Sequence, residues 1–155
     1  MDITDNHFHL DPGGQKEKAV KAFLNSGGTR LVLVHKPYSS WERIDQFKEQ
    51  VKITLRLSEK AREVGAKVAT IASPHPVQLI KLLDKYNSET AVDLYLEAVD
   101  FCVNLVEEGK IVGLGELGRP HFEVDDKTWK LSNNVLQESL VRAKEVDSSV
   151  IFHTE

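Results

Sequence analysis

The chain has 155 residues, of which 41% are apolar and 28% are charged, as expected for one globular domain spanning residues 1–155. Its formal net charge of −4 excludes a broad basic surface for nucleic acid, so phosphate recognition would have to be local or metal-mediated. A single cysteine excludes an internal disulfide. Since no apolar leader or membrane-length apolar run appears, we expect a cytoplasmic protein without a membrane partner.

Short apolar strands alternate with amphipathic helices along the chain. The pattern predicts strands at about 3–10, 31–34, 67–72, 111–116 and 150–153. It predicts helices at about 15–25, 41–64, 77–86, 88–106 and 126–146, with Ser39 or Ser40 capping the second and Ser88 the fourth. This alternation favours parallel β-α-β units, in an open doubly wound sheet or a (β/α)8 barrel. Length alone favours the open sheet, because a barrel needs about 250 residues.

Histidines gather where the predicted strands end. The residues at these ends, in strand order, are His7 and His9, His35, His75, Glu116, and His153. Five of the six histidines therefore map to one rim of the sheet. In α/β folds, this rim is where ligands and catalytic groups collect.

Four of these residues are candidate metal ligands. His7 and His9 share one face of a strand, about 6.5–7 Å apart at the backbone, which suits two ligands of one divalent cation. Glycines flank Glu116 and permit the close backbone approach that a bridging carboxylate needs. His153 ends an apolar strand at the same rim. The structural alternatives are hydrogen-bonded core histidines, a glutamate paired with an arginine, and a frayed terminal histidine.

These residues carry a resemblance to a known family. The segment Asp5-Asn6-His7-Phe8-His9-Leu10-Asp11 resembles the first-strand signature of the TatD-related metal-dependent hydrolases, a family of the amidohydrolase superfamily. His75-Pro76 resembles the family's His-Pro element, and Gly115-Glu116-Leu117-Gly118 its Gly-Glu-Ile-Gly element. The long segment between His9 and Glu116 is similar to an archaeal branch of the family.

The resemblance implies an α/β fold, the (β/α)8 TIM barrel, with about five β/α units in this chain. It also implies two divalent metal ions, one held by His7 and His9, the second by His153, with Glu116 bridging them. Nitrogen-rich ligation favours zinc, manganese, iron or nickel, with magnesium left open.

The sequence departs from the family pattern in two places. Arg119-Pro120-His121 stands where the family carries an aspartate and an aromatic residue. The family also draws a histidine from a sixth strand and an aspartate from an eighth, whereas this sequence ends at Glu155. We therefore assign no catalytic base within the chain and expect one beyond residue 155. The alternatives are completion by another chain, or a five-stranded remnant that self-associates through its unpaired sheet edges.

The expected activity is that of a metal-dependent hydrolase, in which water activated by two metals attacks a phosphodiester. The substrate is the end of a nucleic acid, as for a deoxyribonuclease, or a small ester or amide. His75 and Arg119 are candidate contacts for an anionic substrate group. The alternatives are that His75 only shapes the turn between two prolines and that Arg119 is a solvated loop residue. For His35 and His121, only their location in the chain supports a similar role as substrate contacts. The competing hypothesis is a truncated, non-catalytic fragment or a weak metal-binding domain.

Overall fold

The computed structural model describes residues 2–153, which form one parallel sheet of five strands. The strands are β1 (Thr4–Phe8), β2 (Arg30–Val34), β3 (Lys67–Ile71), β4 (Gly113–Gly118) and β5 (Ser149–His153). Each strand pairs with the next in sequence, in the order β1-β2-β3-β4-β5. A doubly wound sheet reverses its strand order at a switch point. The sequential order therefore confirms the partial TIM barrel, with about five β/α units.

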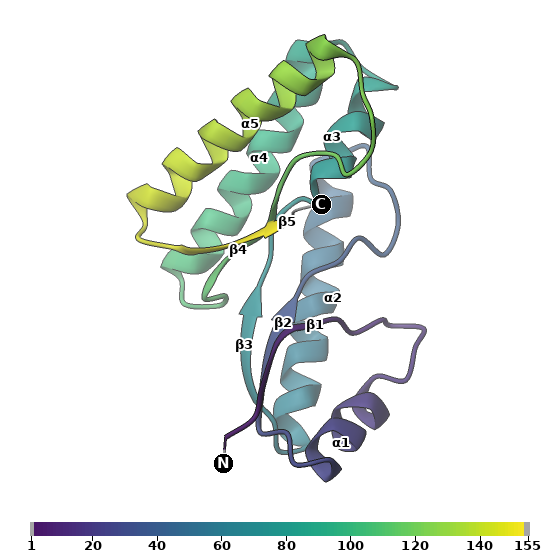
Figure 1. Ribbon diagram of the computed structural model, residues 1–155, viewed down its shortest axis with the longest axis vertical. Helices are drawn as coiled ribbons and strands as arrows, with labels where there is room; N and C mark the ends of the chain where they lie inside the picture. Colours follow the sequence, from purple (N-terminus) through teal and green to yellow (C-terminus); the bar gives the residue numbers. More distant parts are fainter. Residues whose placement is uncertain (1, 154–155) are drawn as a thin grey trace.

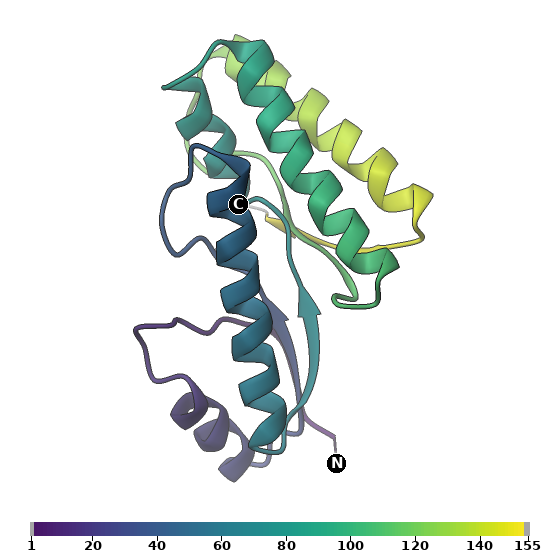
Figure 2. The ribbon, with the colours of Figure 1, turned by 180° about the vertical axis from the view of Figure 1, so that it is seen from behind.

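The helices between the strands cover the sheet from one side. They are α1 (Glu17–Asn25), α2 (Ile44–Glu63), α3 (Pro76–Leu83), α4 (Ser88–Glu107) and α5 (Asp126–Glu145). Figure 1 shows the sheet from the face opposite α2, with β5 running across the direction of β3. Figure 2 shows α2 and α4 in front of the strands. The sheet thus curls as part of a barrel wall does. Within residues 2–153, none of the helices has the length and apolar character needed to cross a bilayer.

Two helix caps differ from the sequence expectation. The N-cap of α2 is Arg43 rather than Ser39 or Ser40, and the side-chain oxygen of Gln46 accepts the Arg43 backbone N–H at 3.1 Å. Trp41 precedes the helix and is only 2% exposed, because its large ring packs into the core.

The cap of α4 is Asn87 rather than Ser88. Its side-chain oxygen accepts the backbone N–H of Thr90 at 2.9 Å, and Ser88 is the first helical residue. Asparagine and serine cap helices about equally well, so residue preference alone does not explain why Asn87 rather than the neighbouring Ser88 is the cap.

Strand pairing is regular in one part of the sheet and irregular in two others. β2 and β3 pair without interruption from Arg30 opposite Lys67 to Val34 opposite Ile71. The β1–β2 register shifts between residues 5 and 8, and the β4–β5 register shifts between residues 114 and 117. Irregular pairing re-aims side chains and is frequent beside functional sites. These two stretches contain His7 and Glu116, so the backbone departs from regular pairing where candidate ligands lie.

The side chain between the two β1 histidines points the other way. Phe8 packs against Phe23 of α1, with ring centroids 6.1 Å apart, as part of a cluster of apolar residues under α1 and α2. Because successive side chains of a strand alternate between faces, Phe8 anchors the helix side. His7 and His9 therefore face the opposite side of the sheet.

Candidate metal centre

The carboxylate of Glu116 lies at the centre of the candidate site. The Glu116 residue is 9% exposed, and its backbone carbonyl accepts a hydrogen bond from Ser73 Oγ at 2.9 Å. Its Oε1 lies 3.6 Å from His7 Nε2 on one side and 3.1 Å from His153 Nδ1 on the other. Residues from β1, β4 and β5, distant in sequence, therefore meet at one carboxylate oxygen.

The glycine before Glu116 is required by the packing of β4. A Cβ atom on Gly115 would lie 2.8 Å from Ile151 Cβ and 3.0 Å from Ile71 Cγ2. A side chain there would push β4 away from its neighbours, because real Cβ atoms do not approach so closely. Gly115 thus lets the strand that carries Glu116 lie close to β3 and β5.

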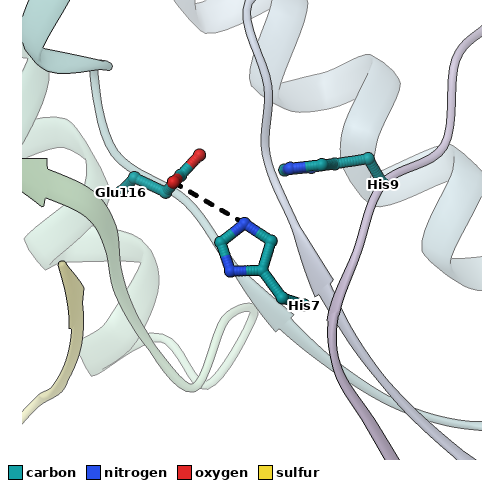
Figure 3. Close-up of side chains that lie close together, drawn as sticks. All are labelled: His7, His9 and Glu116. Atoms are coloured by element: carbon teal, nitrogen blue, oxygen red, sulfur yellow. Dashed lines mark ion pairs between the residues drawn. The ribbon is translucent and has the colours of Figure 1, made fainter. Parts of the chain in front are cut away.

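His7 and His9 form the first side of the site. Their ring centroids are 4.8 Å apart, edge to face. His9 Nδ1 donates a hydrogen bond to the backbone carbonyl of Val34 at 2.8 Å, which leaves Nε2 as the nitrogen with a free lone pair. In Figure 3, a ring nitrogen of His9 is directed toward Glu116. A histidine held in this way is prepared to bind a cation.

His75 and His153 lie on the second side of Glu116, with ring centroids 4.5 Å apart. Burial, followed by the charge of His153, lowers the pKa of His75 to about 4. His75 also caps α3, because its Nδ1 accepts the backbone N–H of Val77 at 3.3 Å. A neutral ring whose Nδ1 is an acceptor carries its proton on Nε2. His75 is therefore better suited to donate to an anionic oxygen than to bind a cation through Nε2.

His121, for which the sequence offers only its location, joins this second side. Its Nδ1 lies 2.9 Å from His153 Nε2, and the two ring centroids are 5.0 Å apart. A line of contacts therefore runs from Glu116 through His153 to His121. The loop between β4 and α5 has no periodic pattern, so its path, and with it the place of His121, depends on tertiary packing.

The side chains present fit divalent cations. Two groups have ligand atoms that all lie within 4.8 Å of one another: His7, His9 and Glu116, and His75, Glu116 and His153. Nitrogen and oxygen ligands at about 2.0–2.2 Å from one cation lie up to about 4.4 Å apart, so small side-chain shifts suffice. Glu116 belongs to both groups. All four predicted ligands, His7, His9, Glu116 and His153, are thus brought together.

The remaining candidate, Arg119, belongs to neither group. Its guanidinium lies over the ring of Trp129, with Cζ 4.7 Å from the ring centroid, and Nη1 is 3.5 Å from Asn133 Oδ1. Arg119 is exposed at the end of β4. The contact with Trp129 orients the guanidinium on the surface of α5.

His35 is buried at the end of β2, where it is 3% exposed. Its Nδ1 lies 2.7 Å from Thr54 Oγ1, which also lies 2.8 Å from the Tyr38 hydroxyl. Burial, together with the charges of His9 and His75, lowers the pKa of His35 to about 3. His35 is therefore a neutral core histidine beside the site.

Comparison with known proteins identifies a family and a curated relative to which this chain is similar. The family model described as TatD related DNase matches residues 4–155. A protein of Methanocaldococcus jannaschii, named "Uncharacterized protein MJ1127", is 31% identical over 159 aligned positions, which cover 100% of this chain and 55% of the relative. The chain therefore spans about half the length of this curated relative.

Proposed function

Because the chain belongs to the family of TatD-related DNases, we propose that it is a metal-dependent hydrolase whose site holds two divalent cations. The observation that carries this proposal is the shared carboxylate of Glu116, whose Oε1 lies 3.6 Å from His7 Nε2 on one side and 3.1 Å from His153 Nδ1 on the other. A structural ion pair needs only one partner for the carboxylate. Histidines on both sides of one glutamate are the arrangement that a bridged pair of cations requires.

In this proposal, His7, His9 and Glu116 hold the first cation, and Glu116 and His153 hold the second. The imidazole nitrogens favour zinc, manganese, iron or nickel, and magnesium remains open. Bound cations supply an activated water and stabilise negative charge on the substrate. The hydrogen bond from His9 to the Val34 carbonyl fixes the orientation of His9 before a cation arrives.

The proposed substrate is a phosphodiester, such as the end of a nucleic acid, or a related ester or amide. His75 is placed to donate from Nε2 to an anionic oxygen, since its Nδ1 is engaged by α3. Arg119 extends the anion-binding surface from its position over Trp129. A net charge of −4 supplies no general attraction for the body of a nucleic acid, which favours recognition at its end.

Metal content and substrate preference test this proposal together. The purified full chain is expected to carry about two transition-metal ions by elemental analysis. Since no catalytic base is assigned within residues 1–155, activity is measured on this chain and on any longer form of the protein. The substrates are single-stranded DNA, a p-nitrophenyl phosphodiester and an amide, and the expected preference is for the phosphodiesters. Less than one ion per chain after loading with zinc or manganese contradicts the proposal. Bound metal with cleavage of the amide alone contradicts the phosphodiester assignment.

A further inference from the structure

We propose that His121 is a positioning residue for the second cation, because it holds His153 so that His153 Nδ1 faces Glu116. This inference rests on the proposed function, since it assumes that cations bind on both sides of Glu116. It assigns a role to a residue of the loop between β4 and α5, at which this sequence departs from the pattern of its family.

The two ring nitrogens of His153 have different partners. Nδ1 lies 3.1 Å from Glu116 Oε1, and Nε2 lies 2.9 Å from His121 Nδ1. A cation that shares the Glu116 carboxylate meets the nearer nitrogen, Nδ1. A neutral imidazole that binds through Nδ1 carries its proton on Nε2. His153 then donates this proton to His121 Nδ1, so the contact persists when the cation is bound.

On the first side of the site, His9 is oriented by a hydrogen bond of the same kind, but to a different acceptor. His9 donates Nδ1–H to the Val34 carbonyl at 2.8 Å and keeps Nε2 for a cation. Ligating histidines nearly always donate their second N–H in this way, which fixes both the tautomer and the ring orientation. A backbone carbonyl is the acceptor for His9, whereas the side chain of His121 is the acceptor for His153. Substitution at position 121 is therefore expected to change cation binding on the second side only.

The chemical nature of the side chain at position 121 also determines how strongly His153 binds the second cation. A neutral imidazole carries no charge, whereas a carboxylate acceptor raises the basicity of the histidine that donates to it. The Oδ1 atom of asparagine or aspartate lies as many bonds from Cα as Nδ1 of histidine. Asparagine at position 121 therefore keeps a neutral acceptor in place, aspartate provides a charged one, and alanine provides none.

The test is a zinc titration of the full chain against a competing chelator, which resolves the two dissociation constants. The second cation has one histidine ligand against two for the first, so it is expected to be the weaker of the two. For His121→Ala, we expect the dissociation constant of this weaker cation to rise about 10–100-fold, with the tighter one unchanged. His121→Asn should recover most of this loss, and His121→Asp should bind the weaker cation more tightly than wild type. Glu123→Gln is the matched control, because Glu123 is an exposed residue of the same loop.

The outcomes separate this inference from the proposed function. Wild-type protein that binds no cation overturns both. Wild-type protein that binds two cations, with His121→Ala binding both equally well, overturns the role of His121 alone. Equal weakening of both cations in His121→Ala, without recovery in His121→Asn, also overturns it, because that result indicates a general structural effect. His121 is exposed, so the variants are expected to fold, and thermal melting checks this.

Discussion

The two sides of Glu116 hold their histidines in different ways. On the first side, His7 and His9 come from one strand and its end, and the backbone carbonyl of Val34 orients His9. On the second side, His75, His121 and His153 come from three separate elements and contact one another through their rings. Both sides also need Glu116 of β4. The first side adds two histidine ligands to this carboxylate, whereas the second adds His153 alone, so we expect the second side to bind its cation more weakly.

Removal of the shared ligand should have the largest effect, because it acts on both sides. Glu116→Gln is expected to lose both cations and to lower kcat about a thousandfold or more, since bound metals contribute several kcal/mol to catalysis. Elemental analysis and steady-state kinetics measure the two losses. Glu123→Gln, which removes an exposed carboxylate elsewhere, should keep both properties. Full metal content with full activity in Glu116→Gln would show that the two sides do not share this residue.

Removal of one histidine from each side should separate the two cations. His7→Ala is expected to weaken the first cation, and His153→Ala the second, each by more than the roughly 10–100-fold effect of an outer partner. Zinc titration with a competing chelator measures both constants. Neither residue belongs to the apolar core, so thermal melting should change little. Loss of both cations in each variant would indicate one joint site rather than two sides.

Packing around β4, the strand that carries the shared ligand, should have the next largest effect, and it should appear in stability. Gly115→Ala is expected to destabilise the protein by about 1–3 kcal/mol, because the added methyl group meets Ile151 and Ile71 at 3.0 Å or less. Urea unfolding measures the change. A stability equal to wild type would mean that β4 and β5 can move apart freely.

The smallest expected effect is on the free energy of unfolding at acid pH, and it comes from His35, which is buried next to the first side. Folded His35 stays neutral because its pKa is lowered to about 3, whereas in the unfolded chain it takes up a proton near its ordinary value of 6.5. Protonation therefore favours the unfolded state, and this part of the stability is present above about pH 6.5 and is lost as the pH falls toward 3. The expected loss from this residue is roughly 1 kcal/mol between about pH 7 and 5.5. Urea unfolding of wild type and His35→Phe at both pH values measures it, and an unchanged difference between the two would contradict the assignment.

Local strand geometry and the edge shared by parallel strands were enough to predict the main site residues from the sequence. The spacing of His7 and His9 within one strand was enough to predict their shared face, because strand geometry is local. Glu116 and His153 were predicted because carboxyl ends of parallel strands meet at one edge. Periodicity predicted all five strands but left the open sheet and the barrel both open. The sequential strand order, a property of the assembled sheet, decided between them.

The features that sequence analysis missed depend on tertiary structure. Trp41 was placed at the start of a helix, but burial of its ring leaves it before Arg43, the cap of α2. His121 had no periodic neighbours to place it, and only the path of its loop brings it to His153. His75 was predicted as a substrate contact, and its position between α3 and His153 could not be derived from a His-Pro pair.

The most direct test of the account is the position of bound metal. Crystals of the zinc-loaded full chain, measured at the zinc absorption edge, locate cations by anomalous scattering without reference to any assumed ligand. We expect two peaks, one beside His7 and His9 and one beside His153, with the Glu116 carboxylate between them. Peaks away from Glu116, or no peak within ligand distance of these residues in zinc-loaded crystals, would contradict it.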